Sequence, residues 1–140
     1  MSDWNTQVIE EFRANGGKVA QFGDAPLVIL GTIGARSGQL REIPLVALVE
    51  SDGDNDGMYI FASKGGAPSN PDWYHNLKAN PGVEVEVAGD AYSARAEITE
   101  GDDRKALYDA QAARYAQFAE YETSAAEAGR TIPVIRLHRA

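Results

Sequence analysis

The chain has 140 residues, a formal net charge of −8 and no cysteine. Its length suits a single domain with a hydrophobic core, and its negative charge argues against non-specific binding of nucleic acid. The lack of cysteine excludes disulfides, thiolate nucleophiles and cysteine-ligated clusters, while His75 and His138 are too few and too distant in sequence for a multi-histidine metal site. No run is apolar enough to span a membrane and no signal peptide is evident, so we expect a cytoplasmic protein.

The N-terminal segment predicts an amphipathic helix over about residues 3–15, within one domain that spans residues 1–140. Trp4, Val8 and Phe12 recur every four residues and therefore share one face of this helix. We expect this face to cover the core, because the polar face is not basic enough to favour anionic lipid. The helix allows at most a peripheral contact with a membrane.

Residues 26–33 and 40–50 predict two strands that form a hairpin, with a glycine-containing turn between them. The first run is rich in Leu, Ile and Val. Pro44 in the second run indicates an edge position or a bulge, because proline has no N–H to donate to a neighbouring strand. A third strand is expected over 58–63, after an acidic turn at 51–57.

The loop Ser63–Gly66 leads into a short predicted helix and is a candidate anion site. Asn70 suits the N-cap of this helix and Pro71 its first position, and the Asn80–Pro81 step ends it. Free backbone N–H groups, a lysine and a hydroxyl converge in such a loop. A loop of this composition can equally serve only to turn the chain, so both interpretations stay open.

The second half of the chain predicts further strands and a long helix. Residues 83–87 alternate apolar and acidic side chains, which is typical of a strand with one face in water. The remaining elements are, in order, a turn at 89–90, a strand over 91–99, a helix over about 102–124 and a strand over 131–138. Antiparallel neighbours dominate, so we predict an α+β, mainly β fold, in which a six-stranded antiparallel sheet closes into a small barrel with flanking helices.

Several segments, taken in order, are similar to the deazaflavin-dependent nitroreductases. These are small split β-barrel proteins of the flavin-reductase-like type, and some act as quinone reductases. The segments are Gly34–Arg41, Pro44–Leu45, Ala62–Ala67, Asn70–Pro81 and Arg130–Val134. The resemblance covers about residues 26–140 and implies coenzyme F420, whose deazaflavin ring carries a phosphodiester and a tail of glutamates. A polyanionic tail requires fixed cations and backbone N–H groups.

The resemblance implies a coenzyme site formed by the first hairpin, the glycine-containing loop and the short helix. The hairpin tip would hold the phosphate and tail, and the second strand would line the ring pocket. The implied residues are Ala35, Arg36, Ser37, Arg41, Pro44, Leu45, Val46, Ala62, Ser63, Lys64, Trp73, Tyr74 and Asn76. No metal ligand is implied, and flavin mononucleotide (FMN), which similar barrels bind, is the alternative cofactor.

The long predicted helix carries the residues that the resemblance implies at the electron acceptor. Some family members have a tyrosine at the position of Phe118, where it is implicated in activating the nitro substrate. Phenylalanine has no hydroxyl, which leaves quinone or enone reduction more open than nitroimidazole reduction. We assign the catalytic role to the neighbouring Tyr115 and Tyr121, with core packing of these side chains as the alternative.

Together these inferences predict an oxidoreductase that uses reduced coenzyme F420 to transfer hydride to a quinone, a nitro compound or another electron-poor organic acceptor. The alternatives are a non-catalytic carrier of F420 or of an apolar ligand on the same barrel, and a reductase that binds FMN. We expect a small-molecule acceptor, no nucleic-acid partner, and a monomer or homodimer in the cytoplasm, with membrane association left open.

Overall fold

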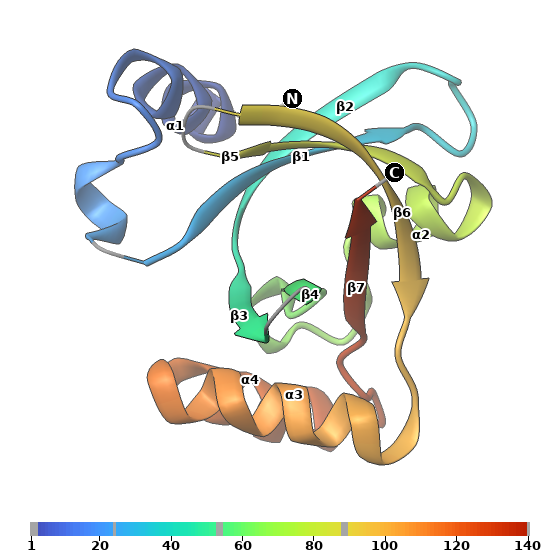
Figure 1. The fold of residues 1–140 in the computed structure, drawn as a ribbon. Coiled ribbons are helices and arrows are strands. Elements are labelled where there is room, and N and C mark those ends of the chain that lie inside the picture. The colour runs from blue at the N-terminus through green and yellow to red at the C-terminus, as the bar shows by residue number, and fades with distance from the viewer. Residues whose placement is uncertain (1–2, 24, 53–54, 88–89, 140) are drawn as a thin grey trace.

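The structure, a computed structural model, describes residues 3–23, 25–52, 55–87 and 90–139. Its elements are, in chain order, α1 (Asp3–Ala14), the 3₁₀ helix η1 (Ala20–Phe22), β1 (Leu27–Ile33), β2 (Leu40–Val46), β3 (Leu48–Asp52), β4 (Asn55–Phe61), the 3₁₀ helix η2 (Lys64–Gly66), α2 (Asp72–Ala79), β5 (Gly82–Val87), β6 (Asp90–Ile98), α3 (Gly101–Arg114), α4 (Gln117–Glu127) and β7 (Val134–Arg139). Within these ranges seven strands form one antiparallel sheet in the order β2-β1-β5-β6-β7-β4-β3, which curls into a half-barrel (Figure 1). The predicted turns at 51–57 and 89–90 fall partly on residues outside the described ranges.

The six-strand prediction is wrong, because the predicted strand over 40–50 is divided at Ala47. Its first part, β2, pairs with β1, and its second part, β3, pairs with β4. Between them the Ala47 N–H donates to the carbonyl oxygen of Pro26 (2.8 Å). Strands β2 and β3 are thus the two edges of the sheet although they are consecutive in sequence. No ladder joins these edges within the described residues, so the sheet is a half-barrel rather than the predicted closed barrel. The edge position of Pro44 is confirmed.

Helix α1 confirms the predicted N-terminal helix and lies against the outside of β1 and β2 (Figure 1). Val8 and Phe12 of the predicted core face belong with Ile29 to one buried apolar cluster, which joins the helix to the sheet. The prediction is wrong for Trp4, which is exposed and packs on Phe22 (6.1 Å between ring centroids). Arg13 Nη2 pairs with Glu42 Oε2 (2.7 Å) on β2 and with Glu86 Oε1 (2.9 Å) on β5. Apolar burial and an ion-pair bridge therefore hold α1 in place.

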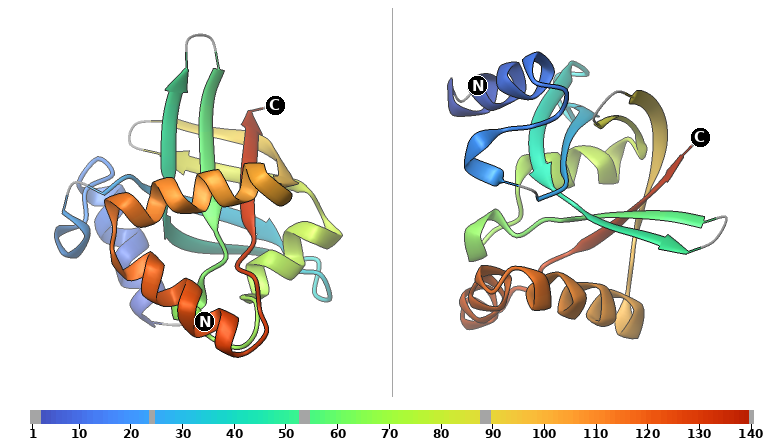
Figure 2. Two further views of the ribbon diagram at one scale, coloured as in Figure 1. Left: turned by 90° about the horizontal axis from the view of Figure 1, so that it is seen from below. Right: turned by 60° about the vertical axis from the view of Figure 1, so that its left-hand side comes forward.

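The predicted long helix is two helices, α3 and α4. Helix α3 ends at Arg114, Tyr115 is extended (φ −132°, ψ 101°), and α4 begins at Gln117. The Tyr108 hydroxyl donates to the carbonyl oxygen of Phe118 (2.6 Å) and fastens the first turn of α4 to α3. The pair covers the side of the sheet that contains β3, β4 and β7 (Figure 2).

The main core lies inside the curl of the sheet. Leu30, Ile60 and Val85 from three strands pack there with Trp73 and Leu77 of α2. A second apolar cluster lies under α3 and α4. The two clusters lie on opposite faces of β4, and the candidate site lies around the loop that follows this strand.

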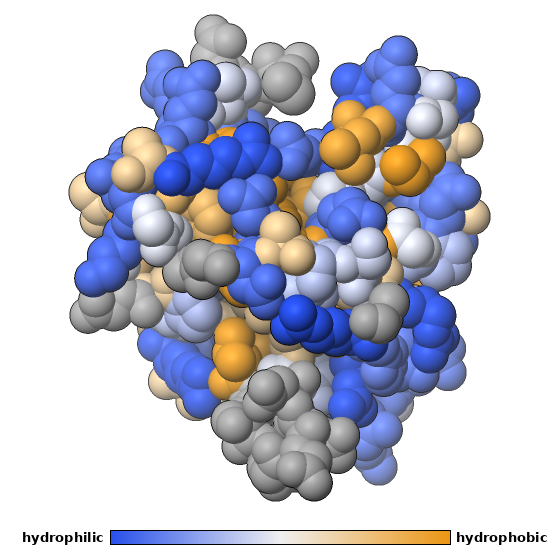
Figure 3. Space-filling view, turned by 45° about the horizontal axis from the view of Figure 1, so that its top comes forward, coloured by the Kyte–Doolittle hydropathy of each residue, from blue (hydrophilic) through white to orange (hydrophobic). Residues whose placement is uncertain are grey.

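The face of the molecule in Figure 3 is mainly hydrophilic, with apolar side chains in small separate groups. Trp4, Leu40 and Val49 are the large apolar side chains exposed among the described residues, and they belong to three different elements. No helix in the described ranges is long and apolar enough to cross a bilayer. Surface hydrophobicity therefore does not mark the site, which has to be located from its polar groups.

Candidate active site

The tip of the β1–β2 hairpin is an exposed turn with two unused backbone donors. Hydrogen bonds from Gly34 N–H to Gln39 O (2.8 Å) and from Gly38 N–H to Gly34 O (3.0 Å) close the turn. The N–H groups of Arg36 and Ser37 donate to no acceptor among the described residues, and both side chains are exposed. Adjacent free N–H groups beside an arginine can receive an anionic oxygen.

Two asparagine side chains fasten α2 to this hairpin. Asn76 Oδ1 accepts from the Ala35 N–H (3.0 Å), and Asn76 Nδ2 donates to Thr32 Oγ1 (3.2 Å). Asn80 Nδ2 donates to the carbonyl oxygen of Ile33 (3.4 Å). Both polar atoms of the Asn76 amide are therefore engaged within the protein, where they hold the hairpin tip against the helix.

The loop after β4 has left-handed backbone at three successive residues. The φ angles are 47° at Lys64, 63° at Gly65 and 79° at Gly66. Gly66 is buried against α4, since a Cβ atom there would lie 2.8 Å from the Tyr121 carbonyl oxygen and 2.9 Å from Ser124 Cβ. The loop Ser63–Gly66, which was predicted to contact the coenzyme, thus packs on the backbone of α4 at Tyr121, which was predicted to contact the acceptor. We call residues 62–70 the coenzyme loop.

Asn70 does not cap α2 as predicted. Pro71 occupies the N-cap position and no side chain caps the helix. Asn70 Oδ1 instead accepts from Arg130 Nε (2.6 Å), and Arg130 also donates to three carbonyl oxygens within residues 62–67. Burial lowers the pKa of the Arg130 guanidinium, which nevertheless stays charged. Sequence reasoning gave Arg130 no role, because its partners lie about half the chain away.

Phe118 is the centre of an aromatic cluster under α3 and α4. Its ring centroid lies 5.8 Å from that of Phe61, 6.3 Å from those of Tyr108 and Tyr115, and 5.4 Å from that of Tyr121. Phe118 is buried, whereas Tyr115 and Tyr121 are partly exposed. The hydroxyls of these two tyrosines form no hydrogen bond with any described residue, so they are available to a ligand.

The Tyr108 hydroxyl differs from those of Tyr115 and Tyr121 because it is buried and bonded within the protein. It donates to the carbonyl oxygen of Phe118, and its side chain is completely buried. Burial, reinforced by the nearby Glu122 carboxylate, raises the pKa of Tyr108 to about 12. Tyr108 therefore stays neutral and holds α3 and α4 together.

Three cationic side chains of the predicted site have no acidic partner. Arg36 and Arg41 form no ion pair with any described residue, and Lys64 Nζ meets only the neutral Ser69 Oγ (3.2 Å). The arginines belong to the hairpin held by the C-terminal half of α2, whereas Lys64 precedes its N-terminus. Helix α2 has eight residues, which is a length of about 12 Å. These cations thus belong to the two segments that adjoin α2, the β1–β2 hairpin and the preceding loop, where an elongated anion would meet them.

The structure does not bring Pro44, Leu45 and Val46 into one pocket. Adjacent side chains of a strand point to opposite faces. Leu45 accordingly packs inside the curl, where Trp73 and Tyr74 are buried, while Val46 packs in the cluster beneath α1. Of the residues predicted for the coenzyme site, Leu45, Ala62, Trp73 and Tyr74 therefore lie together, and all four contribute to the core.

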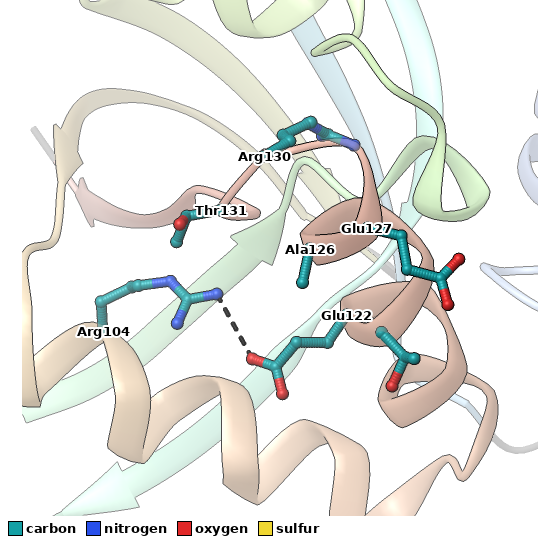
Figure 4. Close-up of a pocket in the computed structure, with 7 residues that line it drawn as sticks. Arg104, Glu122, Ala126, Glu127, Arg130 and Thr131 are labelled. Atoms are coloured by element: carbon teal, nitrogen blue, oxygen red, sulfur yellow. Dashed lines mark ion pairs between the residues drawn. The ribbon is translucent and has the colours of Figure 1, made fainter.

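An open groove of about 660 Å³ lies between α3, α4 and the turn into β7 (Figure 4). Its lining residues are Arg104, Glu122, Thr123, Ala126, Glu127, Arg130 and Thr131. Arg104 Nη2 lies 3.6 Å from Glu122 Oε2, and Arg104 Nε donates to the carbonyl oxygen of Ile132 (2.9 Å). None of these residues was predicted for the site, and Arg130 links the groove to the loop 62–70 through its hydrogen bonds.

Comparison with known proteins identifies relatives along nearly the whole chain. The sequence profile of a family described as F420H(2)-dependent quinone reductase matches residues 4–138. An F420H(2)-dependent quinone reductase of Mycobacterium tuberculosis (strain ATCC 25618 / H37Rv) is 33% identical over 130 residues, which cover 91% of this chain and 85% of the relative.

Two solved structures share both fold and sequence with this chain. One, described as an F420-H2 dependent reductase, has a TM-score of 0.68 and 37% identity, and the match covers 81% of this chain and 94% of the other. A second, described as a domain-swapped dimer, has a TM-score of 0.70 and 34% identity, with 97% and 98% covered. The curled antiparallel sheet is therefore shared with these relatives.

Proposed function

Because this chain belongs to the F420H(2)-dependent quinone reductase family, it is an F420-dependent oxidoreductase of quinones, and we propose that its coenzyme site lies along the β1–β2 hairpin tip, α2 and the loop 62–70. The names of these relatives give both the reductase activity and the dependence on coenzyme F420. Neither FMN nor a non-catalytic carrier role is supported by them.

The unpaired positive charge along α2 is the observation that carries this site. Among the described residues, Arg36 and Arg41 on the hairpin have no acidic partner, and Lys64 on the loop before α2 meets the neutral Ser69. A phosphodiester with a tail of glutamates has negative charges at several points along its length, and these cations match such a ligand. The single terminal phosphate of FMN would leave part of this charge unused.

Bound reduced coenzyme F420 supplies a hydride, and the protein supplies binding, orientation and hydrogen-bond donors. Reduction of a quinone to a hydroquinone by one hydride also requires one proton. The Oη–H groups of Tyr115 and Tyr121 are assigned to donate hydrogen bonds to an acceptor oxygen, where negative charge develops during reduction. The buried rings of Phe61 and Phe118 beside them keep water away from one side of this position.

The described residues share one continuous sheet, which supports a single domain. A homodimer is the assembly proposed for this chain, because a similar solved structure is described as a domain-swapped dimer. Sedimentation of the purified protein at several concentrations tests this assembly, and a monomer at every concentration contradicts it.

The coenzyme site is tested by equilibrium binding of oxidised F420, followed through ring fluorescence. We expect binding that weakens in Arg36→Ala and in Lys64→Ala, and that weakens with added salt, because each variant removes a cation from the site. Arg95→Ala removes the same charge from the exposed face of β6 and serves as the matched control. Binding of FMN alone, or equal losses in all three variants, contradicts the assigned site.

The acceptor side is tested by steady-state reduction of a soluble quinone with reduced F420. Tyr115→Phe and Tyr121→Phe are expected to lower kcat with the quinone and to leave the Kd of the coenzyme unchanged, because each removes only a hydroxyl. If both variants, and the double variant, turn over the quinone at the wild-type rate, the two hydroxyls have no catalytic role.

A further inference from the structure

A single guanidinium spans the loop between β4 and α2. Arg130 Nε donates to Asn70 Oδ1 (2.6 Å), and Nη1 donates to the carbonyl oxygens of Ser63 (3.1 Å) and Ala67 (2.7 Å). Nη2 donates to the carbonyl oxygen of Ala62. Both ends of the loop are thereby tied to one side chain, which comes from a distant part of the chain.

The backbone of Arg130 is itself fixed by the end of α4. Gly129 has φ 77°, its N–H donates to the carbonyl oxygen of Ala126 (2.9 Å), and the Arg130 N–H donates to that of Ala125 (2.8 Å). This pair of bonds is the Schellman arrangement, in which a left-handed glycine ends the helix. Arg130 therefore joins the coenzyme loop firmly to α4, the helix that carries Tyr121.

The loop needs such an external support. Lys64 is a non-glycine residue in the left-handed region, a conformation that its own backbone disfavours. The Ser63 carbonyl oxygen also accepts from the Gly66 N–H (2.9 Å), whereas those of Ala62 and Ala67 have no second donor among the described residues. A guanidinium presents several donors in a rigid plane and can bond them together, whereas a lysine ammonium is a compact donor that cannot span them.

We propose that Arg130 is a positioning residue for coenzyme binding, which holds residues 62–70 in the conformation that presents Ser63 and Lys64 to the coenzyme. The inference rests on the coenzyme site proposed above. Arg130 acts through the loop, because its N–H groups are largely taken by protein acceptors.

The test compares Arg130→Ala and Arg130→Lys with Arg104→Ala. Arg104 is a matched control, because it lines the same groove and also donates to a backbone carbonyl group, that of Ile132, but does not contact the loop. Hydrogen exchange is measured at the amides of Gly66 and Ala67, which donate to Ser63 O (2.9 Å) and Lys64 O (3.1 Å). The Kd of oxidised F420 and the KM values for reduced F420 and for the quinone complete the comparison.

In both Arg130 variants we expect the amide hydrogens of Gly66 and Ala67 to exchange faster, because charge-assisted hydrogen bonds are lost from the loop. We expect the Kd of F420 to rise by about tenfold or more for the same reason. The KM for reduced F420 rises while the KM for the quinone stays near the wild-type value. Methylguanidinium, at concentrations far below those that unfold proteins, restores F420 binding to Arg130→Ala and has no effect on Arg104→Ala. If Arg130→Ala does not fold, Arg130→Lys alone decides the comparison.

Two results overturn the inference and leave the proposed function standing. One is wild-type affinity for F420 in the Arg130 variants, and the other is an equal loss in Arg104→Ala, which would indicate general destabilisation. Failure of the wild-type protein to bind F420 overturns the proposed function itself, and this inference with it.

Discussion

The side-chain carbonyl of Asn76 on α2 accepts a hydrogen bond from the backbone N–H of Ala35 at the tip of the β1–β2 hairpin (3.0 Å). The same amide donates to Thr32 Oγ1 (3.2 Å), on a side chain that is completely buried. A single residue of α2 therefore fixes the turn that carries the unpaired Arg36.

Asn76→Ala is expected to lower the free energy of unfolding by about 1–2 kcal/mol, because two hydrogen bonds are lost and the buried Thr32 hydroxyl loses a partner. Urea denaturation measures this loss. Asn80→Ala removes a single, longer bond of 3.4 Å to Ile33 and should cost less. Equal midpoints for Asn76→Ala and the wild type would show that the amide does not fasten the hairpin.

Gly65 and Gly66 form a matched pair for testing contact between the loop and α4. Both have positive φ, but only Gly66 has neighbours within the reach of a Cβ atom. Gly65→Ala should cost about 1 kcal/mol from backbone strain alone. Gly66→Ala should cost well above 2 kcal/mol, because the methyl group also collides with the backbone of α4. Similar denaturation midpoints for the two variants would contradict close packing of this loop on α4.

Gln111 is completely buried on α3, and its Oε1 and Nε2 atoms have no hydrogen-bond partner among the described residues. Gln111→Met keeps a similar volume without polar atoms, so we expect the free energy of unfolding to rise by about 1 kcal/mol. Thermal unfolding should show a Tm higher by about 3 °C. Gln111→Glu, which buries a charge, should destabilise the protein. A lower Tm for Gln111→Met would mean that the amide has a favourable partner.

The pKa of Tyr108 is raised to about 12 in the folded protein, above the usual value of about 10 for tyrosine. Folding therefore favours the protonated hydroxyl. Its contribution to the free energy of unfolding is complete below the pKa of Tyr108 in the unfolded state, and it is lost as the pH rises through the pKa of Tyr108 in the folded state. The denaturation midpoint should fall between about pH 10 and pH 12. Tyrosinate absorbance should show a late titration that is absent in Tyr108→Phe. A wild-type midpoint with the same alkaline pH dependence as Tyr108→Phe would contradict this shift.

Features set by neighbouring residues in the sequence could be predicted. The spacing of Trp4, Val8 and Phe12 predicted α1 because helical periodicity places them on one face. Pro44 predicted an edge strand because it lacks an N–H group. Two of the segments that carry the resemblance are the tip of the β1–β2 hairpin and the loop after β4, and both adjoin α2 in the fold.

Features set by distant partners could not be predicted. No glycine or proline marks the break at Tyr115, which accompanies the bond between Tyr108 and Phe118. Asn70 has the local chemistry of an N-cap, but it meets Arg130, whose charged donor is the stronger partner. Arg130 lies in one of the segments that carry the resemblance, but its contacts with residues 62–70 are long-range and could not be predicted from that segment.

Strand β7 comes last of the seven strands along the described chain, yet it lies between β6 and β4 in the sheet. A ribosome-bound chain that ends before residue 134 therefore has two further open strand edges, at β6 and β4, and its β3–β4 hairpin has no sheet to join. Exposed edges of this kind invite pairing with other chains. The two parts of the sheet therefore cannot be joined before residues 134–139 have been translated.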